Sequence, residues 1–421
     1  MCIFRIPYFD KMFVSCFWYT LLMTLIMDRK KIVFILLLFL CGCKSELKQK
    51  EEVVNRQEYI DLSNVKYENE PVKLSSFIDE ITYIPLSDTK LLKDIVQLYV
   101  ADSLLFIRCD NDPSIYIFSS NGTYVKPLFD VGNGPGEAFC HTSFICNDEK
   151  SVIAFNGSGY IYNYTYGGEF LKKEKSEINS RLKKLVSYQG DILFYQLSNL
   201  LPQKGELCNP NGDYLLYGED ANSNELVYCY ENCGKDEKAE YRGVIAELET
   251  ADFLTGKLDD SFWFKNLYMD TLFIFNKEKS NFLPKYVFNL GDNSWDYKTF
   301  VHLYYLDKDY LNIYDTKTLL QELFLGNKYL VYRMKKGKDE GVGVYSMSDN
   351  KNLCFTNKYQ NDLDSFLSMI DLKALLPYSF CDGEFLYLPI NSYMFFEEGN
   401  SPFSLQLTEE SNPIILKMKL K

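Results

Sequence analysis

The sequence IYIFSSNGTYVK at residues 115–126 recurs in altered form 46 residues later, as IYNYTYGGEFLK at residues 161–172. Each copy has two short runs of aromatic and apolar residues joined by four residues that end in glycine, Gly122 in the first and Gly168 in the second. A glycine at this place supplies the positive φ angle that many β-hairpins need. A hairpin that returns after 46 residues is close to the period of a four-stranded propeller blade.

Strand-like runs of the same kind follow one another along the chain from about residue 58. They are short, rich in aromatic and β-branched residues, and separated by Asn, Asp, Gly and Ser, which is typical of antiparallel β structure. The expected strands are residues 81–86, 95–101, 103–109, 114–119, 191–197, 270–276, 328–334, 384–390 and 412–420. A helical period is found in residues 365–376 and in parts of 242–258.

The number of strands favours a β-propeller among the all-β folds. A chain with roughly twenty-five strands would make an oversized sandwich or barrel, whereas radial repetition holds that number with few exposed edges. A β-sandwich or a barrel remains the alternative. Residues 200–262 match no blade pattern, so the sequence leaves the blade boundaries open there.

The composition excludes some classes of function before any motif is considered. Of the 421 residues, 47% are hydrophobic and 24% are charged, as in a globular rather than a disordered protein. The 33 Tyr and 31 Phe suit strands, where large flat side chains pack on a half-buried surface. With only two histidines, a histidine-rich zinc site or a histidine base is a poor candidate.

The cysteines leave two interpretations open. Eight of the twelve lie after residue 43, and three of these, Cys208, Cys229 and Cys233, are close in sequence. An even number outside the cytoplasm permits disulfides, whereas single cysteines in a core act as small apolar residues.

The N-terminus has the pattern of a secretory signal. Basic residues 28–31 precede an apolar run over residues 32–40, which is too short to span a bilayer core of about 30 Å. The run ends in Leu40-Cys41-Gly42-Cys43, which resembles the lipobox of bacterial lipoproteins. The resemblance implies cleavage before Cys43 and lipidation of its thiol. We therefore expect a leader over residues 1–42, with Met27 favoured as the true start.

A tether and an acidic globular part follow the leader. Residues 43–57 are mostly polar or charged and free of aromatic residues, so we expect a lipidated flexible tether. The whole chain has a formal charge of −13, and removal of residues 1–42 takes away five basic and two acidic groups, which gives −16. This balance argues against nucleic acid as a partner.

Several segments resemble one family of envelope proteins. The loop Val131-Gly132-Asn133-Gly134-Pro135-Gly136-Glu137 resembles the G-x-GPGE signature of the six-bladed β-propeller lipoproteins of Bacteroidetes, which are related to NHL-type propellers. Residues 74–86, 268–272 and 412–421 resemble that family's entry, middle and terminal strands. The resemblance implies six four-stranded antiparallel blades over residues 58–421. It also implies that the first strands and the last strand share one blade. The family is mostly of unassigned function.

The glycine-rich loop has a functional and a structural interpretation. Asn133, Gly134, Pro135, Gly136 and Glu137 form either a ligand-contact loop at one face of the propeller or a link between blades that needs positive φ angles. A phosphate-binding loop is excluded, because no Lys-Ser or Lys-Thr follows the glycines.

No catalytic or metal-binding motif is found in the sequence. The G-x-S-x-G elbow and the H-E-x-x-H pattern are both missing. Calcium is the one cofactor that the sequence leaves possible, since residues 110–112 and 219–222 offer oxygen ligands. The favoured interpretation is that these are solvated turn residues. Pairs of carboxylates leave room for a propeller hydrolase, lactonase-like or glycan-cleaving, that uses calcium in the central channel.

Two tryptophans near expected turns are candidates for sugar stacking. Trp263 and Trp295 would stack on a glycan if their rings were exposed, whereas most propeller tryptophans pack between blades.

The sequence therefore predicts a non-catalytic module for ligand binding or protein interaction. We expect it to be held to the outer membrane by its lipid, on the periplasmic side or at the cell surface, with a glycan, a peptide or an envelope protein as its partner.

Overall fold

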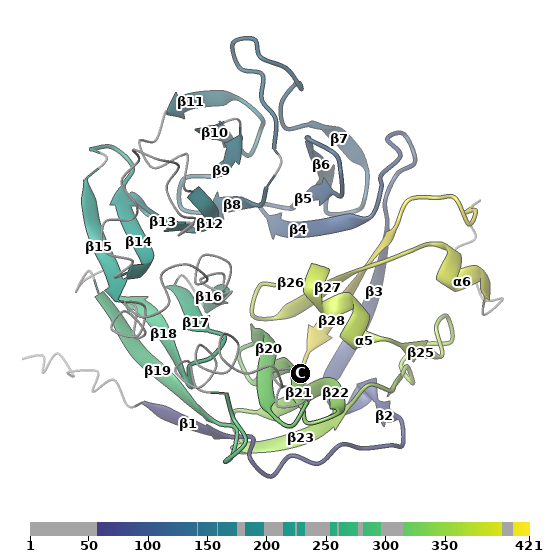
Figure 1. Cartoon of the computed structure of the whole chain (residues 1–421). Helices are drawn as coiled ribbons and strands as arrows, with labels where there is room; N and C mark the ends of the chain where they lie inside the picture. The colour runs from purple at the N-terminus through teal and green to yellow at the C-terminus, as the bar shows by residue number, and fades with distance from the viewer. Residues whose placement is uncertain are drawn as a thin grey trace, which may run out of the picture. The chain divides into compact units, whose positions relative to one another are not determined.

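Strands dominate the chain in the computed structural model. The structure describes residues 57–140, 142–157, 159–174, 182–197, 214–223, 225–231, 253–258, 261–276, 281–295, 315–397 and 407–421. Residues 57–421 form one compact unit, in which the sheets are arranged around a common centre (Figure 1).

Four sheets each use four strands that are consecutive in the sequence. They are β4 (Ile95–Ala101), β5 (Leu104–Cys109), β6 (Ile115–Ser119) and β7 (Tyr124–Pro127); β8 (Phe144–Asn147), β9 (Val152–Gly157), β10 (Tyr160–Thr165) and β11 (Phe170–Glu174); β12 (Leu182–Gln189), β13 (Ile192–Leu197), β14 (Tyr214–Asp220) and β15 (Leu226–Glu231); and β20 (Thr318–Leu325), β21 (Tyr329–Lys336), β22 (Asp339–Ser346) and β23 (Lys351–Thr356). All their pairings are antiparallel, so each sheet is a meander of the kind that forms a propeller blade.

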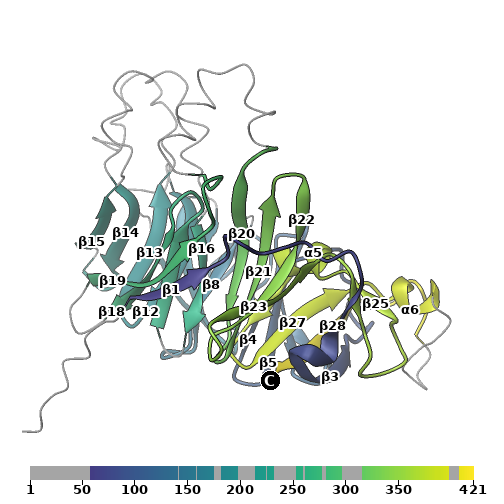
Figure 2. The ribbon, with the colours of Figure 1, turned by 90° about the horizontal axis from the view of Figure 1, so that it is seen from below.

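A fifth sheet has gained a strand from far away in the sequence. It contains β16 (Phe253–Leu258), β17 (Ser261–Asn266), β18 (Thr271–Asn276) and β19 (Asn281–Asn289), and β1 (Glu58–Asp61) pairs in parallel with β19. Figure 2 shows β1 beside β19 at the edge of this sheet. The added strand covers backbone groups that would otherwise form an open edge.

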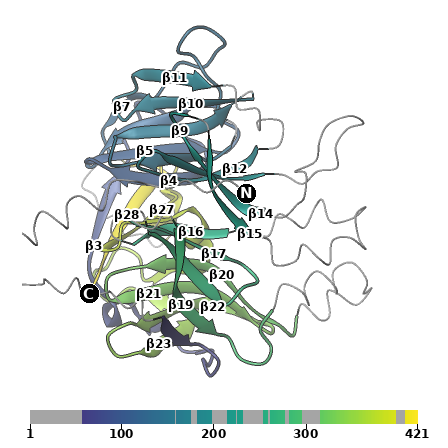
Figure 3. The ribbon, with the colours of Figure 1, turned by 90° about the vertical axis from the view of Figure 1, so that its left-hand side faces the viewer.

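The sixth sheet, here called the closing sheet, joins the two ends of the unit. It contains β26 (Phe380–Cys381), β27 (Phe385–Ile390), β28 (Ile414–Leu420) and β3 (Ile78–Pro85), and β28 pairs with β3 from Ile414 opposite Pro85 to Leu420 opposite Ile78. Figure 3 shows β3 and β28 side by side. The expectation that the first and last strands share a blade is confirmed for β3, whereas β1 belongs to another sheet.

A small seventh sheet differs from the expected architecture. Its strands β2 (Val72–Lys73), β24 (Tyr359–Gln360) and β25 (Met369–Ile370) have two residues each. The all-β propeller of mostly four-stranded antiparallel blades is present, but the described residues form seven sheets, so the count of six is not confirmed. The extra sheet forms because the links before β3 and after β23 run side by side and pair.

The repeated hairpin is confirmed in detail. β6 pairs with β7 and β10 pairs with β11, as the third and fourth strands of consecutive sheets. Gly122 has a φ of +86° and Gly168 a φ of +77°, as the two hairpin links require.

The core lies between neighbouring sheets. Phe106 and Ile117 of one sheet pack with Phe144 and Phe155 of the next, and buried clusters of the same kind lie between the other successive pairs. Tyr359 of the small sheet joins the cluster between the β20–β23 sheet and the closing sheet. The many Tyr and Phe residues therefore hold adjacent sheets together.

Helices are short in the part of the chain that the structure describes. They are the 3-10 turns η1 (Leu74–Ser76) and η4 (Leu376–Tyr378) and the helices α5 (Leu372–Leu375) and α6 (Tyr393–Glu397). The helix expected over residues 365–376 is thus limited to its last turn. Parts of residues 242–258 were also expected to be helical; of these, residues 253–258 form β16, and residues 242–252 lie outside the described residues. No helix among the described residues has the length and apolar character needed to span a membrane.

Candidate functional site

A pocket of about 370 Å³ lies at the centre of the ring. It is lined by the innermost strands β4, β8, β12, β16, β20 and β26, one from each sheet of four or more strands, together with residues just before or beside them. Its volume is near the lower end of the range for small-molecule sites, about 300–1,000 Å³.

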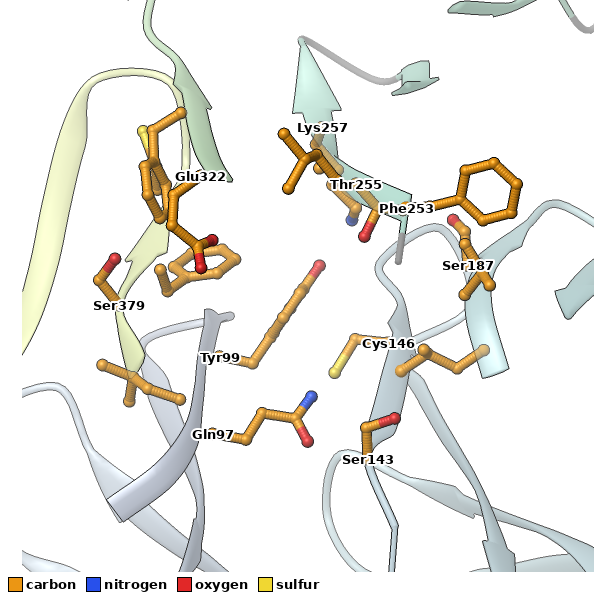
Figure 4. Close-up of a pocket in the computed structure, with 18 of the residues that line it drawn as sticks. Gln97, Tyr99, Ser143, Cys146, Ser187, Phe253, Thr255, Lys257, Glu322 and Ser379 are labelled. Atoms are coloured by element: carbon orange, nitrogen blue, oxygen red, sulfur yellow. The ribbon is translucent and has the colours of Figure 1, made fainter. Parts of the chain in front are cut away.

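The side chains that face the pocket are a mixture of hydroxyl, aromatic and charged groups. Figure 4 shows Ser187, Thr255, Lys257, Glu322, Ser379 and Tyr99 around the opening. Thr255 and Lys257 point inward because alternate residues of a strand lie on the same face. The Tyr99 ring is in contact with Phe380, with ring centroids 4.6 Å apart. The pocket thus offers a flat apolar surface beside several hydroxyl groups.

One carboxylate holds two of the groups at the pocket, Tyr99 and Lys257, and a third group behind them. Asp148, in the turn after β8, accepts hydrogen bonds from Tyr99 at 3.0 Å and from the hydroxyl of Tyr166. It also forms an ion pair with Lys257, whose ammonium group lies 5.4 Å from the centre of the Tyr99 ring. Because β4, β8 and β16 meet here, this network fixes three inner strands relative to one another.

Two buried groups beside Asp148, Cys146 and Tyr99, keep their protons at neutral pH. Burial raises the pKa of the Cys146 thiol well above its usual value, and the charge of Asp148 raises it further. Burial, with Cys146 and Asp148 as smaller causes, also raises the pKa of Tyr99. Neither group is therefore prepared to act as a nucleophile or a base, since each would first have to ionise.

The glycine-rich loop lies away from this pocket. It connects β7 to β8, and the site where a side chain would begin at Gly136 is 3.6 Å from Phe170 of the outermost strand β11. The Glu137 carboxylate accepts a hydrogen bond from the Gly134 amide at 2.7 Å, and the Gly136 carbonyl accepts one from Tyr164 at 3.1 Å. In this arrangement Glu137 closes the loop on itself.

The two tryptophans are buried. Trp263 is 1% exposed and its indole donates to the Lys257 carbonyl at 3.1 Å, while Trp295 is 5% exposed and packs edge-on against Tyr268. Neither ring has a free face on which a sugar could stack.

The acidic residues considered for calcium binding accept hydrogen bonds within their own turns. Asp112 accepts from the Ser114 amide and the Tyr116 hydroxyl, and Asp220 accepts from the amides of Asn222 and Ser223. Within the described residues, no three His, Cys, Asp or Glu side chains are grouped so that they could hold a metal ion.

Five cysteines are free thiols, namely Cys109, Cys140, Cys146, Cys354 and Cys381. Cys43 and the tether lie outside the described residues, as do Cys208 and Cys233.

Sequence reasoning named Trp263, which lines the pocket, but missed the other residues of its wall. Gln97, Tyr99 and Arg108 were treated only as parts of strands. One signal was available, since Gln97 and Arg108 are polar residues inside otherwise apolar runs, IVQLYVA and LLFIRC. A polar residue in such a place needs a partner or a function.

Comparison with known proteins indicates a family and a fold. A family model described as "Domain of unknown function (DUF4934)" matches residues 57–419. No curated protein matches the chain.

Three solved structures from Bacteroides match the chain, with different degrees of similarity. A protein of Bacteroides fragilis that is named as an exported protein has a TM-score of 0.62 at 14% identity, over 86% of this chain and 99% of that one. A DUF4221 member from Bacteroides vulgatus has a TM-score of 0.48 at 11% identity, over 82% and 97%. A protein of unknown function from Bacteroides thetaiotaomicron has a TM-score of 0.39 at 9% identity, over 82% and 73%. The first of these similarities supports the propeller fold, and the other two are too weak to carry an argument.

Proposed function

The chain belongs to the DUF4934 family, and from this premise we propose that it is a non-catalytic, ligand-binding propeller of the cell envelope whose site is the central pocket. One observation carries the proposal: six inner strands enclose a pocket in which Cys146 and Tyr99 keep their protons and Asp148 is already engaged by three donors. Such a site can bind, but it has no activated group at Cys146 or Tyr99.

The lining favours a small polar ligand that also has an apolar face. The rings of Tyr99 and Phe380 offer stacking area, and Ser187, Thr255 and Ser379 offer hydroxyl groups nearby. Sugar rings combine an apolar face with many hydroxyl groups, and short peptides combine apolar side chains with amide groups.

We also propose that the propeller has six blades. The six sheets with four or more strands each contribute an innermost strand to the pocket, whereas the small sheet contributes none. The small sheet would then be an insertion between the β20–β23 blade and the closing blade.

The proposed location is the outer membrane, with Cys43 as the lipidated residue. The B. fragilis protein of similar fold is named as exported, and the lipobox-like residues 40–43 agree with a lipid anchor. Labelling of growing cells with an alkyne palmitate analogue should mark the wild-type protein and leave Cys43→Ala unlabelled. Equal labelling of both would exclude this anchor. Protease treatment of intact cells would then separate the cell surface from the periplasmic side.

The binding function is tested with a variant that fills the pocket. Thr255 points into the pocket, so Thr255→Phe should abolish the thermal stabilisation that a matching glycan or peptide gives to the wild-type protein. Thr82→Phe on β3 is the control, since Thr82 is exposed at the outermost strand of its sheet. Ligands that stabilise all three proteins equally would place binding elsewhere. Turnover of a lactone or a glycoside by the wild-type protein would replace the binding function by that of a hydrolase.

A further inference from the structure

Arg108 is a charged residue on the second strand of a sheet, where its neighbours are apolar. It lies on β5 opposite Gln97 of β4, and both residues line the central pocket. Paired residues of adjacent antiparallel strands project from the same face of the sheet. The Arg108 guanidinium therefore belongs to the wall of the pocket and not to the outer surface of the ring.

No protein group in the described residues compensates the charge of Arg108. Its Nε is buried without a hydrogen-bond partner, and its guanidinium makes no ion pair within that part of the chain. The contrast with Arg333 is clear, because the latter donates to Glu340 at 2.6 and 3.0 Å. A buried donor that lacks a partner costs free energy, so an unpaired arginine in a pocket is expected to have a role.

The thiols near Arg108 cannot neutralise it. Burial raises the pKa of Cys109 to about 12 and that of Cys140 to about 12, although the charge of Arg108 lowers both in part. Both thiols are therefore uncharged at neutral pH.

The two cations among the lining residues, Arg108 and Lys257, differ in their surroundings. Lys257 is paired with Asp148, and Glu322 is the one acidic residue among those that line the pocket. Arg108 has no ion-pair partner among the described residues, so its place in the lining favours a ligand group with a negative charge.

We propose that the ligand of the central pocket carries a carboxylate, and that Arg108 binds this group through paired N–H donors. The inference rests on the proposed binding function of the pocket. Arginine is suited to the role because its planar fork matches the two oxygens of a carboxylate.

The spacing along β4 defines the shape of such a ligand. Arg108 lies at the level of Gln97, and Tyr99 is two residues farther along, a separation of about 7 Å. A carboxylate on Arg108 thus leaves the body of the ligand near the Tyr99 and Phe380 rings. An acidic sugar and the C-terminus of a short peptide share this arrangement of a carboxylate beside an apolar surface.

The test compares matched charged and neutral probes on the full-length protein. Binding of glucuronate, glucose, N-acetyl-alanine and N-acetyl-alanine amide is measured by calorimetry in a buffer without phosphate. The variants are Arg108→Met, Arg108→Lys and, as the matched control, Arg333→Met. Thr255→Phe reports whether any binding seen takes place in the pocket.

We expect at least one carboxylate to bind about tenfold or more tightly than its neutral partner. This preference should vanish in Arg108→Met, be reduced in Arg108→Lys and persist in Arg333→Met. The carboxylate that binds identifies the source of the ligand, sugar or peptide. Arg108→Met should melt no earlier than the wild-type protein, because the buried Nε of Arg108 has no hydrogen-bond partner to lose. A structural arginine would instead lower the melting temperature when replaced.

The failures of the two proposals can be told apart. If probes bind in a manner sensitive to Thr255→Phe, but neutral and charged partners bind equally and Arg108→Met has no effect, the carboxylate inference is wrong and the binding function stands. If probes bind Thr255→Phe as well as the wild-type protein, or if none binds at all, the pocket is not the site and both proposals fall.

Discussion

The Gln97 side chain satisfies both backbone hydrogen-bonding groups of Phe144. Its amide nitrogen donates to the Phe144 carbonyl at 2.7 Å, and its amide oxygen accepts from the Phe144 N–H at 3.0 Å. β4 and β8 belong to different sheets, so no ladder of backbone hydrogen bonds connects them. A side chain here takes the place of a neighbouring strand and links two inner strands at the wall of the pocket.

Replacement of Gln97 should therefore weaken the ring. Gln97→Ala leaves two backbone groups of Phe144 without partners, and we expect the free energy of unfolding to fall by about 2 kcal/mol. Urea denaturation followed by tryptophan fluorescence measures the change. Gln360→Ala, at an exposed position of β24, should have almost no effect. Equal stability of the two variants would contradict the bridging role.

Asn412 should be the most sensitive asparagine of the closing sheet. Its side chain donates to the carbonyls of Ser87 and Lys90 and accepts from the Leu92 amide, all at 2.7–2.8 Å. Asn412→Ala removes these three hydrogen bonds between the two ends of the unit, and we expect a loss of about 2–3 kcal/mol in unfolding experiments. The exposed Asn391→Ala is the control. A small effect at Asn412 would mean that strand pairing alone closes the ring.

The fully buried Lys265 should make stability depend on pH. Burial lowers the pKa of Lys265 to about 7, although Asp270 partly opposes this. In the unfolded chain a lysine holds its proton up to about pH 10.4. The unfolded state thus binds more protons above pH 7, so the lysine becomes less destabilising as the pH rises from about 7 towards 10.

The comparison of wild type with Lys265→Met isolates this effect from other titrating groups. The variant should be more stable by roughly 2–4 kcal/mol at pH 6.5, and this advantage should shrink by about 1–2 kcal/mol at pH 8.5. Lys328→Met, at an exposed position, should show a constant difference over the same range. A constant difference for Lys265→Met as well would mean that its pKa is not lowered.

The buried thiols should resist alkylation in the native state. Burial raises the pKa of Cys109, Cys140 and Cys381 to about 12 and that of Cys354 to about 11. At pH 8 only a minute fraction of each is thiolate, the reactive form. Peptide mass spectrometry after treatment with iodoacetamide should find these four cysteines unmodified in buffer and modified in urea. Rapid labelling of Cys381 in buffer would be the clearest contradiction, since this residue lines the pocket.

The strands were predictable because their signals are local. Residues 95–101 were expected as a strand and form β4 with the same bounds, and the glycines of the repeated hairpin adopt the positive φ angles expected of them. The small sheet could not be predicted, because strands of two residues have no period. Its pairing depends on the links around Val72 and Tyr359 being brought together by the ring.

The pocket was beyond the reach of sequence patterns for a physical reason. Glu137 and Trp263 are conspicuous in the sequence, but one closes its own loop and the other fills the core. The pocket combines Tyr99, Lys257 and Glu322, which lie on three different sheets and meet only when the ring is formed. Their significance depends on distances that no local stretch of sequence encodes.

The pairing of β28 with β3 also sets the earliest time at which the ring can close during synthesis. During synthesis β3 leaves the ribosome early and must wait for the seven residues of β28 at the far end of the chain. At about 5–20 residues per second, that delay is on the order of tens of seconds. Throughout this time β3 has a bare edge, and the exposed flank of the first complete sheet has no neighbour. The nascent chain therefore needs some other contact to cover the edge of β3 until translation ends.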